Sequence, residues 1–541
     1  MAKDKAALGA IAVFILGGLL WLTRTWIPVE DLAITELEVR RLTSAFPLSG
    51  PYSSLPFRHP GPALFISLWP IYVLFGERSS AQLTANIWLG GLALGVALAA
   101  ARRLGGNLLA VGVTAGIAVW SLERGHPILL QPWNPYVGAI PTVALILLTW
   151  ALVEGNAKAL PFAVVLSTWM VQAHIQFIPT SILLMAVGVI GLAVHVYRIE
   201  ETPRLAALAK PVAISVGLGV LLWAPVVYDV LANGTQSNPA AIVRYLRDGN
   251  PHPLPKVMTH DVVGIARSQL SLQPTWAGGP RPYSAYLSPG AVLTPWLVLV
   301  VIAAGLVAMR RRAWIELRGL AVAALAFAGS IAGIAQIRGP IGSWYLVAAE
   351  ASAITLVALS MMSLVRSVLE SARAMHLLEK PGALSVLYQR SQLVSATAVV
   401  LLAALAVVGM KTPDRELTTA QVAAQMRPAI EKTIDGNTVL LQARSGYGGW
   451  IQSTLALQLE RSGYNVFATT TLTGKYPRDM EAAPPPGTTR LVVVTDPPPD
   501  VEWDPSVTVV TDASYQLEKG HRKTHVVVVE APLDLVFLIV K

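Results

Sequence analysis

The sequence contains no cysteine, and this absence excludes a disulfide framework, a thiolate metal site and a cysteine nucleophile. Charged residues are scarce as well, at 13% of the 541 residues, whereas a soluble domain carries about 25%. Hydrophobic residues make up 54%, so a lipid bilayer is the natural solvent of the chain. The formal net charge of +9 does not indicate nucleic-acid binding, because the lysines and arginines lie in short connections between apolar runs.

The apolar residues gather in runs close to the ~20 residues that a helix needs to cross a ~30 Å hydrocarbon core. These runs predict about eleven spanning helices, at 6–26, 80–101, 107–122, 136–153, 159–175, 177–196, 211–230, 290–309, 319–336, 343–365 and 392–410. No small-residue cleavage site follows the first run, so we expect it to remain as a membrane anchor. The expected fold class is a polytopic α-helical membrane protein with a C-terminal α/β domain.

The connections between the runs alternate in charge. One set is rich in Lys and Arg and comprises Arg102-Arg103, Lys158, Arg198 to Lys210, Arg310 to Arg318 and Arg366 to Arg390. The positive-inside rule makes this set cytoplasmic, which places the N-terminus in the cytoplasm. An odd number of spans then places the tail outside, so we expect a multi-pass protein of the plasma (cell) membrane.

The stretch Pro62 to Phe75 is apolar but too short to be a twelfth span. At ~1.5 Å per residue it would cover only about 21 Å as a helix. Counting it would also reverse the side of every later connection and place Arg310 to Arg312 outside. We expect a helix that lies along the outer membrane interface.

The predicted spans divide the chain into a membrane domain, 1–410, and an extracytoplasmic tail, 411–541. Two outer loops of the membrane domain, 27–79 and 229–290, are long enough to hold a site. The tail alternates β-rich runs such as 437–444 and 490–496 with a helical pattern at 450–463, which predicts an α/β domain. Its cluster of Gly446, Gly448 and Gly449 lacks the GxGxxG spacing of a dinucleotide site.

Carboxylates follow the first span directly. Asp31 and Glu36 flank an apolar stretch, where the head group of a membrane-embedded substrate would meet water, and Glu30 precedes them. A carboxylate in a partly dry site can act as a general base towards a hydroxyl. The alternative is a set of carboxylates that are only solvated at the membrane surface.

Two adjacent basic residues, Arg58 and His59, precede a rigid Pro60-Gly61-Pro62 turn in the same loop, and Tyr52 lies just before them. Cations at the start of the interfacial helix could bind a phosphate at the lipid surface. The alternative is a basic pair that reaches up to lipid head groups.

Taken in order, these motifs resemble the GT-C membrane glycosyltransferases. The residues that carry the resemblance are Asp31 with Glu36, the His59 to Pro62 turn, Leu74-Phe75-Gly76, the Arg102 to Gly106 turn, and Trp133-Asn134-Pro135. The sequence is similar to protein O-mannosyltransferases and lipid A aminoarabinose transferase, and most similar to actinobacterial arabinofuranosyl- and mannosyltransferases of the cell wall. The resemblance covers residues 1–180 well and the rest loosely.

The resemblance implies a polyprenyl-phosphate sugar donor, with Asp31 as the catalytic base and Arg58 or His59 on the donor phosphate. The lysine that the family carries at this turn is absent here. The second outer loop, Glu123 to Asn134, would contact substrate through His126, Trp133 and Asn134.

Three polar residues lie farther along, at the outer ends of spans. Gln172 and His174 end the fifth span, where they either line a wet pocket or are satisfied within the protein. Arg338 lies in a short outer loop and could bind a lipid phosphate or cap a helix.

The sequence therefore predicts an inverting glycosyltransferase that moves arabinofuranose or mannose from a polyprenyl-phosphate donor to a hydroxyl of an extracytoplasmic glycan, lipoglycan or protein. No cofactor is expected; no ligand spacing requires a divalent metal, although the sequence does not exclude one. One alternative is a lipid or solute transporter, which would usually show internal repeats that we do not find. Another is an O-antigen ligase or polymerase, which would rely on outer Arg and His.

Overall fold

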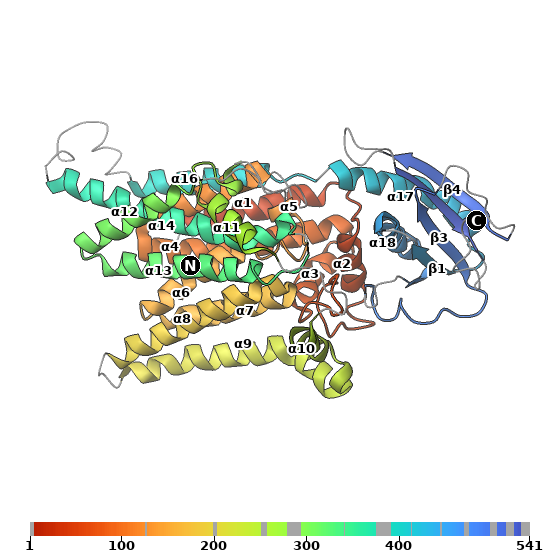
Figure 1. Cartoon of the computed structure of the whole chain (residues 1–541), viewed down its shortest axis with the longest axis horizontal. Helices are drawn as coiled ribbons and strands as arrows, with labels where there is room; N and C mark the ends of the chain where they lie inside the picture. The colour runs from red at the N-terminus through yellow and green to blue at the C-terminus, as the bar shows by residue number, and fades with distance from the viewer. Residues whose placement is uncertain are drawn as a thin grey trace.

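The computed structural model describes residues 5–124, 127–198, 203–249, 257–278, 294–339, 341–374, 391–412, 414–443, 446–469, 475–497, 506–515 and 524–531. A helical part and a smaller sheet-containing tail lie at opposite ends of the long axis, with two short helices, α2 and α3, between them (Figure 1).

Six helices within these ranges are long and apolar enough to cross a membrane: α1 (Lys5–Leu22), α4 (Ser79–Arg124), α8 (Ile178–Tyr197), α9 (Pro203–Asn233), α13 (Trp314–Ile334) and α14 (Val347–Ala374). Shorter apolar helices accompany them: α3 (Ala63–Leu74), α6 (Ala139–Val153), α7 (Leu160–Ala173), α12 (Leu297–Arg310) and α16 (Ser391–Val408). Together they make a multi-pass membrane protein, as the hydropathy of the sequence predicted.

Helix α4 contains two of the expected spans. Its backbone reverses at Gly106, where φ is 67° and ψ is −164°, a conformation that a residue with a Cβ rarely adopts. Asn86 on the first arm donates hydrogen bonds of 3.3 and 3.1 Å to the carbonyl oxygens of Leu129 and Gln131, which follow the second arm, so the chain has returned to the end where α4 begins. The expected spans 80–101 and 107–122 are therefore the two arms of one hairpin.

The first and last spans lie side by side and point the same way. A Cβ on Gly9 would come within 2.7 Å of Val400, and one on Gly17 within 2.5 Å of Val407, so glycines allow the two backbones to approach closely. Because α1 and α16 are parallel, the loop after α1 and the tail after α16 leave the helices at the same end.

The basic connections meet at the other end. Arg318 pairs with Glu154 at 2.6 Å, and Arg311 and Arg366 pair with Glu370 and Glu316 at 2.5 and 3.0 Å. The spans thus alternate in direction as expected, and the polytopic fold class is confirmed. Which end faces the cytoplasm stays a prediction.

Short helices form the end that carries the first loop. They are α2 (Asp31–Arg40), α5 (Pro127–Leu130), α10 (Asn238–Asp248) and α11 (Thr259–Gln269), with 3-10 turns at Ile175–Phe177, Gly234–Gln236, Thr275–Ala277 and Ser343–Leu346. A further 3-10 turn, Ala157–Ala159, lies at the opposite, basic end. The expected interfacial helix is α3, whose Leu64, Phe65 and Leu68 are buried while Leu74 is exposed.

The tail contains α17 (Asp414–Thr433), β1 (Thr438–Ala443), α18 (Gly446–Arg461), β2 (Asn465–Thr469), β3 (Thr489–Thr495), β4 (Thr508–Tyr515) and β5 (Thr524–Glu530). The strand order is β2-β1-β3-β5-β4, with β1 parallel to β2 and β3, and β5 antiparallel to β3 and β4. Alternating residues such as Leu441, Val493 and Val528 pack with Ile451 and Leu455 of α18 in one core. This arrangement confirms the expected α/β tail.

The tail shares its core with α2 of the first loop. Ala33, Ile34 and Leu37 of α2 belong to the same buried apolar cluster as the tail strands. Ion pairs surround the contact: Arg41 pairs with Glu460 and, at 2.8 Å, with Asp479. The first loop and the tail therefore form one continuous structure.

Candidate active site

Asp31 is the first residue of α2 and lies where the first loop, the second outer loop and the tail meet. The indole N–H of Trp133 donates a hydrogen bond of 3.0 Å to Oδ2 of Asp31. Burial raises the pKa of the Asp31 carboxyl, while the Trp133 hydrogen bond and the charge of Lys475 oppose that rise. A carboxylate in this setting can accept a proton from a hydroxyl at near-neutral pH.

Aromatic side chains extend away from Trp133. Tyr136 and Trp344 lie 4.8 and 5.6 Å from it between ring centroids, and Tyr345 lies 5.7 Å from Trp344. His174 follows at 6.1 Å from Tyr345. The structure thus links two predicted residues, Trp133 and His174, through Trp344 and Tyr345. The sequence analysis missed Trp344 and Tyr345 because no motif marks them.

Lys475 of the tail also faces the start of α2 and was missed by the sequence analysis. Its ammonium acts electrostatically on both Glu30 and Asp31, and lies 5.9 Å from the ring centroid of the predicted residue Tyr52. The tail therefore contributes a cation to the surroundings of Asp31.

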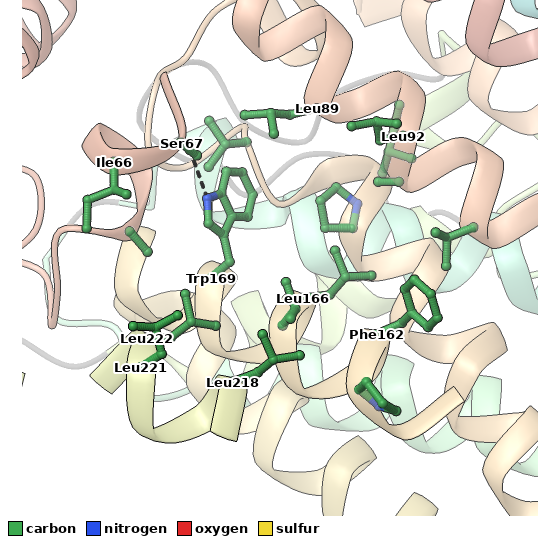
Figure 2. Close-up of a pocket in the computed structure, with 18 of the residues that line it drawn as sticks. Ile66, Ser67, Leu89, Leu92, Phe162, Leu166, Trp169, Leu218, Leu221 and Leu222 are labelled. Carbon is green, nitrogen blue, oxygen red and sulfur yellow. Dashed lines mark hydrogen bonds between the residues drawn. The ribbon is translucent and has the colours of Figure 1, made fainter. Parts of the chain in front are cut away.

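A large apolar groove runs through the membrane part beside this site. It has a volume of about 1650 Å³ and is lined by α3, α4, α6, α7 and α9. Figure 2 shows Leu166 and Trp169 of α7 facing Leu89 of α4 and Leu218 of α9 across it. The lining reaches from Lys158 and Lys210 at the basic end to Tyr136 and Tyr228 at the other.

Tyr136 connects the groove with the candidate base. It lines the groove and packs edge-on against Trp133, which bonds Asp31. A long apolar molecule in the groove would therefore end close to the carboxylate of Asp31.

Glu36, the other candidate base, is fully buried on the next turn of α2. Its carboxylate accepts hydrogen bonds from Tyr72 and Ser79 at 3.0 and 3.1 Å and pairs with Arg461 of the tail. These contacts join α2, α3, α4 and α18. A base role for Glu36 stays a prediction, and its surroundings favour a connecting role.

The basic pair of the first loop is engaged within the protein. Arg58 pairs with Glu38, and its backbone N–H donates a 2.8 Å hydrogen bond to Asn238. His59 is only 3% exposed; burial, with the nearby Arg58 charge, lowers its pKa to about 3, so the ring is neutral. Phosphate binding by this pair remains untested, and a neutral imidazole offers no charge for it.

The outer end of α7 holds the Pro-Gly-Pro turn in place. The Ile175 N–H donates to Nδ1 of His59 at 3.3 Å, and the Ala63 N–H donates to Oε1 of Gln172 at 3.2 Å. The His59 and His174 rings lie 4.2 Å apart. Gln172 and His174 are thus satisfied by protein contacts, which was one of the two expected outcomes.

Three candidates remain: Asn134, Arg338 and His126. Asn134 is buried, and Arg338 is partly exposed with no hydrogen bond or ion pair to any described residue. His126 falls outside the described ranges. Within those ranges, no group of three or more His, Asp or Glu residues is arranged to hold a metal ion.

No family profile matches the sequence, and no curated protein matches it significantly. Solved structures do match. The chain is similar to apo ArnT from Cupriavidus metallidurans, with a TM-score of 0.56 and 15% identity over 98% of this chain and 100% of that one. It is similar to the same protein bound to undecaprenyl phosphate, with a TM-score of 0.50 and 14% identity over 98% of both chains. The chain therefore has the same fold as ArnT over nearly its whole length.

Proposed function

We propose that the protein is a membrane glycosyltransferase that moves one sugar from a polyprenyl-phosphate donor to a hydroxyl outside the cytoplasm. The observation that carries this proposal is the apolar groove that ends at Tyr136, next to the Trp133–Asp31 hydrogen bond. A polyprenyl chain is a long apolar molecule of the kind that fits such a groove. The ArnT structure bound to undecaprenyl phosphate, which has the same fold, supports the donor class.

In the proposed reaction Asp31 acts on the acceptor. Its carboxylate takes the proton of the acceptor hydroxyl while that oxygen bonds to the anomeric carbon of the donor sugar. The bond between the anomeric carbon and the phosphate oxygen breaks, and its electron pair leaves with the polyprenyl phosphate. This single displacement inverts the anomeric centre.

The surroundings of Asp31 suit this role. The Trp133 hydrogen bond fixes one carboxylate oxygen, and the partly exposed position of Asp31 allows an acceptor to reach the other. Positive charge near the leaving phosphate would stabilise the negative charge that develops on it.

The sugar and the acceptor follow from sequence resemblance alone. Arabinofuranose or mannose is the proposed sugar, and an envelope glycan, a lipoglycan or a protein is the proposed acceptor. A panel of decaprenyl-phosphate arabinofuranose and polyprenyl-phosphate mannose, incubated with the protein in lipid nanodiscs, would identify the donor through the release of polyprenyl phosphate.

Replacement of the base tests the proposed function. Asp31→Asn keeps the side-chain shape and removes its basicity, so we expect transfer to fall by about 10²–10⁴-fold while donor binding persists. Asp248→Asn is the matched control, because Asp248 lies exposed on the outer helix α10 and pairs with its neighbour Arg247. Normal sugar transfer by Asp31→Asn would refute the assignment of Asp31 as the base. Transport of the intact donor by the wild type, without sugar transfer, would refute the proposal that the protein is a glycosyltransferase.

A further inference from the structure

We propose that Lys475 of the tail binds the phosphate of the lipid donor, so that the tail forms part of the active site. This inference rests on the proposed function and adds to it the ligand of the phosphate. Arg41 and Arg58 of the first loop are cations as well, but both pair with carboxylates of the protein.

Lys475 is a buried cation with few partners. It is 9% exposed, and within the described residues its ammonium makes one hydrogen bond, of 3.3 Å, to the carbonyl oxygen of Gly449. The carboxylates of Asp31 and Glu30 act on it electrostatically. An ammonium has three N–H donors, and a buried charge that lacks partners is costly. Open donors on a buried cation are what an anionic ligand requires.

Two tyrosine rings hold the ammonium in place. The ring centroids of Tyr52 and Tyr476 lie 5.9 and 5.7 Å from Nζ, within the range of cation–π attraction. Tyr476 is itself fixed, because its hydroxyl lies 3.1 Å from that of Ser453 on α18. The lysine is therefore positioned before any ligand arrives.

The start of α18 adds to the positive character of this place. Gly449 belongs to the first turn of α18, and the N-terminal end of a helix carries a partial positive charge that attracts anions. A Cβ on Gly449 would come within 3.2 Å of Nζ, so glycine leaves room for the lysine. Gly449, one member of the glycine cluster that the sequence analysis left without a role, thus lies beside Lys475.

Lys475 lies close to Asp31, the proposed catalytic base. Lys475 and Tyr52 both interact electrostatically with Asp31. Other cations are committed elsewhere: Arg58 to Glu38, Arg41 to Glu460, and Arg461 to Glu36. Unlike these three arginines, Lys475 has no ion pair among the described residues, and it lies beside Tyr52 and acts on Asp31.

The experiment compares two lipids that differ only in the phosphate. Binding of undecaprenyl phosphate and of undecaprenol to the full chain in nanodiscs is measured for the wild type, Lys475→Met, Lys475→Arg and Lys432→Met. Lys432 is the control, because it is an exposed lysine in the last turn of α17. We expect Lys475→Met to lose about 10- to 100-fold in affinity for the phosphate lipid and none for the alcohol. Lys475→Arg should retain most of the preference, and Lys432→Met all of it.

The outcomes separate the two proposals. A wild type that does not distinguish the two lipids overturns the proposed donor, whereas a preference that survives in folded Lys475→Met overturns the role of Lys475 alone. A shift in the pH dependence of transfer without a change in lipid preference would also overturn the role of Lys475 as phosphate ligand, since Lys475 would then only position Asp31.

If Lys475→Met does not fold, Lys475→Gln serves as the same test, because the amide can keep the bond to Gly449. Competition by millimolar inorganic phosphate against undecaprenyl phosphate, lost in Lys475→Gln, supports the site; competition unchanged by the substitution overturns it.

Discussion

The indole N–H of Trp133 donates a 3.0 Å hydrogen bond to Oδ2 of Asp31, although the two residues belong to different outer loops. This bond joins the loop after α1 to the loop after the α4 hairpin. Burial raises the pKa of the Asp31 carboxyl, and this hydrogen bond opposes the rise because it stabilises the charged form. The relationship makes Trp133 a positioning residue for the proposed base.

Removal of this bond should change the pH dependence of transfer. Trp133→Phe keeps the ring and removes the donor, so the pKa of Asp31 rises further and the acidic limb of the rate profile moves to higher pH. A hydrogen bond to a charged group contributes about 1.5–3 kcal/mol, which corresponds to a shift of about one to two pH units. Trp223→Phe is the control, because its indole N–H bonds Thr168. Profiles that coincide for wild type and Trp133→Phe would contradict the role of Asp31 as base.

A bulky residue in the groove should exclude the lipid. Leu166 lines the groove and faces its interior in Figure 2, so Leu166→Trp would occupy space that the polyprenyl chain needs. Each buried methylene contributes about 0.8 kcal/mol, so the exclusion of two or more costs about tenfold or more in affinity. Binding of undecaprenyl phosphate measures the effect. Leu325→Trp, on the exposed surface of α13, should leave affinity unchanged, and an equal loss in both variants would argue against the groove as the lipid site.

Glu36→Gln should weaken the attachment of the tail. The fully buried carboxylate pairs with Arg461, which is partly exposed, so we expect a loss of about 1–3 kcal/mol in stability. Thermal unfolding and limited proteolysis of the tail would report it. Glu77→Gln is the control, because the carboxylate of Glu77 is 53% exposed where it pairs with Arg40. A Glu36→Gln protein that is fully stable yet inactive would instead make Glu36 the base.

The membrane orientation is open to a direct test. The structure places the turn after Arg103 at the end opposite the tail, and the charge pattern predicts that this end is cytoplasmic. A reporter fused after Arg103 should therefore read as cytoplasmic, and one fused after Lys411 as extracytoplasmic. A cytoplasmic reading after Lys411 would place the proposed site on the wrong side for a polyprenyl-phosphate donor.

The spans could be predicted from the sequence because hydropathy and charge are local properties. Each expected apolar run coincides with a helix or with one arm of α4. The run Pro62 to Phe75, which is too short to span the membrane, forms the short helix α3. Trp133 and Asp31 were both predicted, since their motifs lie in ordered succession along the chain.

The environment of the basic residues could not be predicted in this way. Arg58 and His59 look like an exposed basic pair in the sequence, yet packing against α7 and α10 buries the imidazole and neutralises it. Lys475 lies in a segment without periodicity or motif, and only the docking of the tail on α2 brings it near Asp31. Such contacts depend on tertiary structure, which local patterns do not encode.

The parallel contact between α1 and α16 also sets an order of events during biosynthesis. Helix α1 is synthesised before the other described spans, but α16, the neighbour that fits Gly9 and Gly17, is made only after the intervening spans. The tail follows α16 in the chain and can cover α2 only after it has been made. A chain synthesised only as far as α16 would therefore carry Asp31 without Lys475, so the proposed phosphate site would form only after the tail has been made.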